Sequence, residues 1–146
     1  MKQWITLALL TLTTGLAAAQ SGPAGLWRTI DDETKAEKSL VRITEAGGVF
    51  TGKVEKIADA AKADAKCDQC TDDRKDKPIV GMTIVRNVKV SAGDAATWEG
   101  GDILDPNNGK VYKVRIRTGD GGKKLEVRGY IGTPMLGRTQ TWIRVE

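Results

Sequence analysis

The C-terminal half of the chain alternates apolar and polar residues in short segments that turn residues separate. The clearest segments are Gly109–Arg117, Lys124–Ile131 and Gly137–Val145. Alternation with a period of two is typical of a strand with one buried face and one solvated face. The pattern therefore predicts antiparallel β-strands joined by tight turns.

Similar but less regular segments precede this half. The strands expected there are Gly25–Thr29, Ser39–Thr44, Val49–Ile57, the apolar stretch Pro78–Val90 and Trp98–Leu104. Gly47-Gly48 fits the turn of a hairpin, and Asp105–Gly109 is a dense turn signal. About eight strands result, a number that closes a sheet around packed side chains or one small ligand. The prediction is an all-β fold, a single antiparallel up-and-down barrel.

One stretch, at about residues 58–77, interrupts the row of strands. Its first part, Ala58–Lys66, is rich in alanine and predicts one or two helical turns. A polar loop with the pair Cys67-x-x-Cys70 follows. The barrel is therefore expected to carry a short helical and loop insertion here.

Cys67 and Cys70 are the only cysteines of the chain, and three interpretations compete. A zinc site would need two further ligands, which the sequence does not offer in a matching pattern. A redox dithiol would benefit from a lowered thiol pKa, but the neighbouring acids, such as Asp68 and Asp72, act in the opposite direction. A structural disulfide that shapes the loop in an oxidising compartment is favoured.

The N-terminus has the three parts of a secretory signal. Lys2 is followed by the apolar run Trp4–Leu16 and by Ala17-Ala18-Ala19. The run is shorter than the roughly 20 residues of a membrane-spanning helix. We expect a signal peptide over residues 1–19, a domain over residues 20–146, and a periplasmic or secreted protein that does not span a membrane.

Composition narrows the functional classes. The chain contains no histidine, which removes Ser-His-Asp and Cys-His catalysis and the commonest transition-metal ligand. The formal net charge is +4, but acidic and basic residues are interleaved. The basic face Lys113, Arg115 and Arg117 lacks the interleaved aromatic residues that nucleic-acid binding favours. We expect no catalytic residue, no metal, no cofactor and no nucleic-acid partner.

Several short motifs together resemble the DUF2147 family of small exported bacterial proteins. They are Gly25-Leu26-Trp27, Lys77-Pro78-Ile79-Val80-Gly81, Gly101-Asp102-Ile103-Leu104-Asp105-Pro106, Gly109-Lys110-Val111-Tyr112, Arg128-Gly129-Tyr130-Ile131-Gly132 and Gly137-Arg138-Thr139-Gln140-Thr141-Trp142. The resemblance implies a lipocalin-like or fatty-acid-binding-protein-like barrel, and it implies no established activity.

The pair Gly25-x-Trp27 also resembles the opening motif of lipocalins. In those barrels the tryptophan closes one end beneath a basic side chain of the last strand, and the contact is a cation–π interaction. Trp27 is therefore expected to be structural. Arg144 or Arg138 is expected to supply the basic side chain.

The candidate ligand-binding residues are Arg128, Tyr130, Arg138 and Trp142. Arg128-x-Tyr130 resembles the carboxylate-binding motif of fatty-acid-binding proteins, in which a guanidinium and a phenol hold the acid. If aliphatic residues fill the barrel, Arg128 faces solvent. If the barrel is hollow and polar, Arg128 and Tyr130 face inward.

The function expected from these features is binding of a small apolar or acidic ligand, such as a fatty acid, by a non-enzymatic periplasmic protein. The alternative is a structural or protein-interaction module of the cell envelope with a filled barrel. A thiol oxidoreductase using Cys67 and Cys70 is the third hypothesis.

Overall fold

The computed structural model describes residues 22–146, so the expected signal peptide lies outside the described residues. The strands are β1 (Gly25–Ile30), β2 (Glu37–Ala46), β3 (Val49–Ile57), β4 (Thr83–Val90), β5 (Thr97–Asp105), β6 (Lys110–Gly119), β7 (Lys124–Tyr130) and β8 (Gly137–Arg144). Three single-turn 3₁₀ helices lie between them, η1 (Ala60–Lys62), η2 (Asp120–Gly122) and η3 (Pro134–Leu136). Among the described helices, none has the length and apolar character needed to cross a bilayer.

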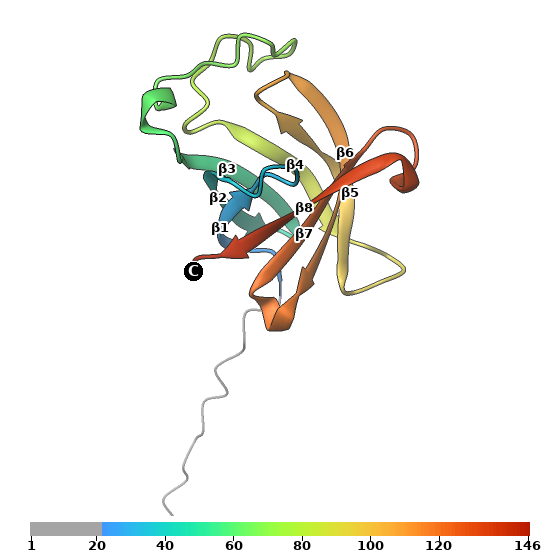
Figure 1. Cartoon of the computed structure of the whole chain (residues 1–146). Helices are drawn as coiled ribbons and strands as arrows, with labels where there is room; N and C mark the ends of the chain where they lie inside the picture. Colours follow the sequence, from blue (N-terminus) through green and yellow to red (C-terminus); the bar gives the residue numbers. More distant parts are fainter. Residues whose placement is uncertain (1–21) are drawn as a thin grey trace, which may run out of the picture.

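Each strand pairs antiparallel with the next, and β1 pairs with β8, so the sheet closes on itself (Figure 1). The predicted eight-stranded up-and-down barrel is therefore confirmed. Most boundaries differ from the expected ones by one or two residues, and the largest difference is at the expected strand Pro78–Val90, which begins only at Thr83. Before it, the chain turns, and the amide of Met82 donates to the carbonyl of Ile79.

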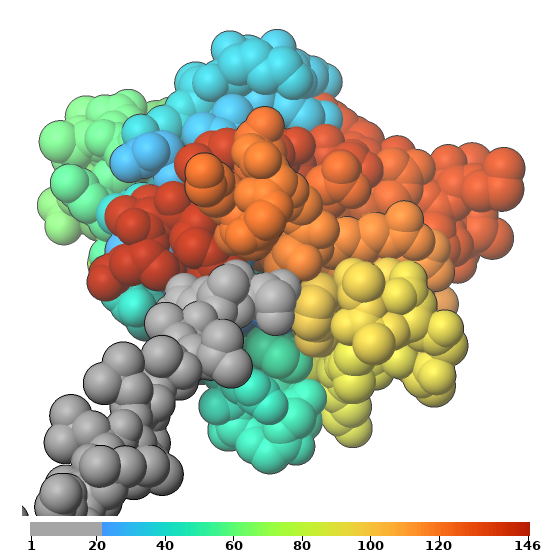
Figure 2. All heavy atoms as spheres, turned by 90° about the horizontal axis from the view of Figure 1, so that it is seen from below, coloured from blue at the N-terminus to red at the C-terminus, as the bar shows by residue number. Residues whose placement is uncertain are grey.

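The up-and-down topology gives the barrel two unlike ends. The end reached by residues 22–24 and the C-terminus also carries the β2–β3, β4–β5 and β6–β7 connections, and we call it the tryptophan end after Trp27. Figure 2 views the molecule from this side. The opposite end, the loop end, carries the β1–β2, β3–β4, β5–β6 and β7–β8 connections.

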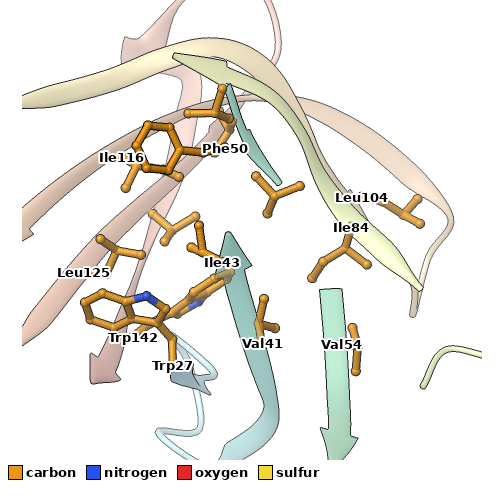
Figure 3. Close-up of a cluster of buried hydrophobic side chains, with 14 of the residues drawn as sticks. Trp27, Val41, Ile43, Phe50, Val54, Ile84, Leu104, Ile116, Leu125 and Trp142 are labelled. Carbon is orange, nitrogen blue, oxygen red and sulfur yellow. The ribbon is translucent and has the colours of Figure 1, made fainter. Parts of the chain in front are cut away.

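Strand alternation puts the aliphatic residues inside, as the sequence predicts. On β6, Val114 and Ile116 are fully buried, whereas the intervening Arg115 lies on the outer face. Figure 3 shows Trp27 and Trp142 together in the core, with Ile43 and Leu125 beside them. Burial of these side chains removes apolar surface from water, which stabilises the fold by roughly 25 cal/mol for each Å² of apolar surface buried.

The β3–β4 connection covers part of the outer wall. On β4, Val85 faces the interior, where it contacts Gly52, and the adjacent Ile84 is nevertheless buried. Leu104 is also buried, and Figure 3 places it near Ile84. The covering loop explains why both faces of the sheet are apolar here.

A disulfide between Cys67 and Cys70 holds the tip of that loop, and the predicted pairing is confirmed. The two residues are 0% and 1% exposed. The loop packs on the β5–β6 turn so closely that a Cβ on Gly109 would lie 1.9 Å from the carbonyl oxygen of Gln69. Glycine is therefore required at position 109, where φ is also +72°.

Candidate functional site

Trp27 and Arg144 close the tryptophan end. The Cζ of Arg144 lies 4.2 Å from the centroid of the Trp27 ring, which is a cation–π distance. The indole Nε1 of Trp27 donates to the carbonyl of Pro23 at 2.8 Å. Of the two arginines expected from sequence, the structure places Arg144 in this position.

Arg144 also binds the neighbouring backbone. Its Nε donates to the carbonyl of Gly122, and its two Nη atoms donate to the carbonyls of Ala24 and Gly22 at 2.8 and 2.7 Å. Burial lowers the pKa of its guanidinium, since desolvation disfavours the charged form. One side chain thus connects residues 22–24, the β6–β7 turn and the Trp27 ring at the tryptophan end.

The first residue of β1 must be glycine for this arrangement. Gly25 has φ of +141°, and a Cβ there would lie 2.5 Å from the Nη1 of Arg144. The Gly25-x-Trp27 motif is thus explained by the close approach of Arg144 and by the buried ring two residues later.

The inner face of β8 runs from the tryptophan end toward the loop end. Trp142 is 1% exposed, and its Nε1 donates to the Oε1 of Gln140 at 3.0 Å. Gln140 is half-buried and Arg138 is exposed. Polarity and exposure therefore increase together along one strand face.

At the loop end, Arg138 holds two carboxylates of the β1–β2 connection. Its Nε and Nη2 donate to the two carboxylate oxygens of Asp32 at 3.0 and 2.8 Å, and Nη2 also lies 2.9 Å from Glu33. Hydrogen bonding to Asp32 raises the pKa of Arg138. The geometry is the bidentate fork that suits a carboxylate.

Half-buried inner-face residues lie next to Arg138. Gly129 pairs with Arg138 in the register, and it has no side chain to fill the space on the inner face. A Cβ at Gly129 would lie 3.4 Å from the Cβ of Tyr112 and 3.7 Å from Ile103. Tyr112 and Ile103 are themselves only partly buried. The loop end therefore combines a carboxylate-binding guanidinium with accessible apolar and phenolic surface.

Arg128 and Tyr130 lie on the outer face of β7. Leu125 and Val127, on the alternate positions, are 0% and 3% exposed and face the core. The inward-facing alternative for Arg128 and Tyr130 is therefore wrong, because aliphatic residues take the inner positions. The candidate pair does not meet Arg138 and Trp142 in one site.

Arg128 instead borders an outer groove with a volume of about 300 Å³. Its lining residues are Arg115, Arg117, Glu126, Arg128, Pro134, Met135 and Thr139. The guanidinium of Arg128 donates to the carbonyls of Pro134 and Met135 and, at 2.8 Å, to the hydroxyl of Thr139. These bonds fix the β7–β8 connection over the groove.

The β3–β4 loop is held to β4 by a side-chain ion pair. The Nη2 of Arg74 lies 2.5 Å from Asp72, and its Nη1 donates to the carbonyl of Thr83 at 2.9 Å. Hydrogen bonds from Arg74 lower the pKa of Asp72 to about 2. The loop is thus anchored by charge-assisted bonds in addition to the disulfide.

Two further residue classes bear on chemistry. Within residues 22–146, no three His, Cys, Asp or Glu side chains gather as metal ligands would. The sulfur atoms of Cys67 and Cys70 are covered by the β5–β6 turn, so a partner protein has no direct access to the disulfide. This burial favours the structural interpretation over the redox one.

Sequence reasoning missed the partners of Arg138. Asp32 and Glu33 lie between two of the expected strands, in a stretch for which the sequence predicts no site, 106 and 105 residues away from Arg138. It also missed the groove at Arg115 and Arg117, which it assigned to a solvated face. Barrel closure, and the fold of the β7–β8 connection, create both features.

Comparisons with known proteins agree with the fold. The family model DUF2147, described as an uncharacterised protein conserved in bacteria, matches residues 25–144. Among solved structures, protein HP1028 of Helicobacter pylori, described as belonging to the lipocalin family, superposes with a TM-score of 0.72. The two chains share 22% identity over 86% of this chain and 84% of the other. No curated protein matches the sequence significantly.

Proposed function

The chain belongs to the DUF2147 family, and from the barrel that it shares with a lipocalin-family protein we propose that it is a small-ligand-binding protein without catalytic activity. A barrel of eight strands offers one inner surface whose access is limited to its ends. Trp27 and Arg144 close the tryptophan end, so a ligand would enter from the loop end.

The proposed ligand is a short apolar acid bound at the loop end. The observation that carries this proposal is the bidentate grip of Arg138 on the Asp32 carboxylate, beside half-buried Tyr112 and Ile103. A ligand carboxylate would replace Asp32 on the same guanidinium, and its apolar part would lie over Gly129. Fully buried Val114 and Ile116 fill the barrel below this level, which favours a short ligand over a long chain.

The expected compartment is the periplasm or the exterior of the cell. The proposal rests on the sequence of residues 1–19, which lie outside the described residues. The disulfide between Cys67 and Cys70 supports it, because such bonds persist in oxidising compartments.

Calorimetric titration with straight-chain carboxylic acids of increasing length tests the ligand class. We expect Arg138→Gln to weaken binding at least tenfold, because a charge-assisted pair contributes about 1.5–3 kcal/mol. Asp32→Asn removes the internal competitor and is expected to strengthen binding. Unchanged affinity in Arg138→Gln, or no binding by an acid of any length, would refute the proposal.

Arg42→Gln is the matched control for this experiment. Arg42 is also a partly exposed arginine held by two carboxylates, those of Glu55 and Glu146, but it projects from the outer face of β2. Its replacement removes the same charge and leaves the loop end intact. Ligand affinity should therefore not change in this variant.

The filled middle of the barrel favours one alternative function, an envelope structural or protein-interaction module. In that case the connections at the loop end would contact a protein partner and the interior would hold no ligand. Native mass spectrometry of the protein purified from its own cells distinguishes the two. A co-purifying small mass supports ligand binding, and a stoichiometric protein complex without such a mass supports the alternative.

A further inference from the structure

The β7–β8 connection exposes three large apolar side chains in six residues. Ile131, Met135 and Leu136 are 63%, 87% and 74% exposed. Figures 1 and 2 both show this connection, with η3, standing out from the side of the barrel. Among residues 22–146, the other large exposed apolar residues are single valines in other segments, so the cluster is specific to this connection.

A basic face lies directly beside this apolar loop. Along β6, Lys113, Arg115 and Arg117 project outward on alternate positions. Arg128 of β7 pairs with Arg115 in the register. Like charges directly opposite on one sheet face repel each other, and here the carboxylate of Glu99 offsets the charge of Arg115. Arg128 is therefore the cation of this pair that remains available to an external anion.

The groove between these residues contains more positive than negative charge. Its lining includes three arginines and one carboxylate, that of Glu126. Glu99 neutralises Arg115, with their Nε and Oε2 atoms 3.0 Å apart. Among residues 22–146, Arg117 and Arg128 lie within ion-pair distance of no carboxylate, and their hydrogen bonds are to hydroxyl and carbonyl oxygens. Two carboxylates nevertheless act on Arg117, because Glu126 pairs with it in the register and Asp94 interacts with it electrostatically.

We propose that this face docks the protein on the surface of an anionic lipid bilayer. Met135, Leu136 and Ile131 would enter the boundary between headgroups and acyl chains, and the groove at Arg117 and Arg128 would hold a lipid phosphate. Charge complementarity selects the bilayer as the occupant, because apolar side chains flanked by cations are the combination that binds anionic interfaces.

This docking is independent of the ligand proposed for the barrel interior. It involves outer-face and loop residues, whereas the proposed ligand site involves Arg138 and the inner face. Docking would bring the loop end close to the lipid, from which an apolar acid could be exchanged.

Sedimentation with lipid vesicles is the first test. The full chain is mixed with vesicles of phosphatidylglycerol and phosphatidylethanolamine, and in parallel with vesicles of phosphatidylcholine alone. We expect binding at least tenfold tighter to the anionic vesicles, and a marked loss when salt is raised to about 0.5 M, which shortens the Debye length to a few Å. Equal binding to both compositions, or binding to neither, overturns the proposal.

Variants locate the surface. Met135→Ser with Leu136→Ser is expected to weaken vesicle binding at least tenfold, and Lys113→Gln with Arg117→Gln about tenfold or more, since each cation near an anionic surface contributes about fivefold. These side chains are exposed, so the barrel should remain folded, which the melting temperature checks. The matched control is Lys89→Gln with Val90→Ser, a basic and apolar pair on β4. Loss of binding in the control, or unchanged binding in both test variants, contradicts the assignment.

A fluorescence measurement reports insertion directly. Met135→Cys carrying an environment-sensitive fluorophore should shift its emission to the blue on anionic vesicles, whereas Val90→Cys with the same label should not. Titration with inorganic phosphate separates the second source of the same anion. If phosphate binds at micromolar concentration and vesicles produce no emission shift, the groove is a site for a soluble anion and the docking proposal fails.

Discussion

Two arginines lie at inner-face positions of β8, and their environments are opposite. Arg144 lies over Trp27, binds backbone carbonyls, and has a pKa lowered by burial. Arg138 is exposed, binds the carboxylates of Asp32 and Glu33, and has a raised pKa. A structural cation and a cation with exchangeable partners therefore lie six positions apart on one strand.

The difference indicates that one strand contributes to stability at the tryptophan end and to the proposed ligand site at the loop end. Carbonyl oxygens of the backbone cannot move away from Arg144 without disturbing the segment that leads into β1. Carboxylates on a surface connection can leave Arg138 at little cost, because exposed ion pairs contribute about 0–1 kcal/mol. The predictions below test this division.

The largest effect is expected for Trp27→Ala. Removal of this fully buried indole leaves a cavity at the tryptophan end and should lower the free energy of unfolding by about 3–5 kcal/mol. Urea denaturation followed by circular dichroism measures the loss. A change below about 1 kcal/mol would show that the ring is not the plug of the barrel.

The two arginines themselves provide the most direct comparison. Arg144→Met should destabilise the protein by about 2–4 kcal/mol, because it removes the cation–π contact and leaves partly buried carbonyls without their charged donor. Arg138→Met should change stability by no more than about 0.5 kcal/mol. Equal losses of unfolding free energy in the two variants, measured under the same denaturation conditions, would contradict the difference between the tryptophan end and the loop end.

Strong acid should weaken the anchor of the β3–β4 loop. The pKa of Asp72 is about 2, below its usual value of 3.8, because Arg74 donates to its carboxylate. The stabilisation is therefore complete above about pH 4 and is lost as the pH falls through 2. The carboxylate is about one-third exposed, so we expect less than about 1 kcal/mol.

Asp72→Asn isolates this contribution. The pKa values of Asp31 and Asp94 are also lowered by hydrogen bonds, so some acid sensitivity will persist in the variant. The prediction concerns the difference in stability between the two proteins, which should be largest near neutral pH and should be lost as the pH falls through 2. A constant difference across this range would contradict it.

A small change in stability is also expected for Gly129→Ala. The new Cβ would lie in van der Waals contact with Tyr112 and Ile103, so the free energy of unfolding should change by less than about 1 kcal/mol. Affinity for a carboxylic acid should nevertheless fall several-fold, because the methyl group occupies the proposed ligand site. Unchanged affinity would place the ligand elsewhere.

Local pattern was enough to predict most of the fold. The range Val49–Ile57 is an observed strand with the predicted bounds, and the alternation on β6 correctly separates Val114 and Ile116 from Arg115. These predictions succeed because strand periodicity and turn chemistry depend on neighbours in the sequence. The site was harder to predict from the sequence, since Arg128 and Tyr130 fit a binding motif and yet face outward.

By itself, the sequence determined which residues form strands, where the chain turns, and which side of each strand is apolar. Only the tertiary structure decided that Arg144 lies over Trp27, that Arg138 binds Asp32, and that the β7–β8 connection lies over a basic groove. The reason is closure of the barrel, which joins β1 to β8 and brings together residues more than a hundred positions apart. No local periodicity encodes that register, because it is set by the packing of the whole sheet.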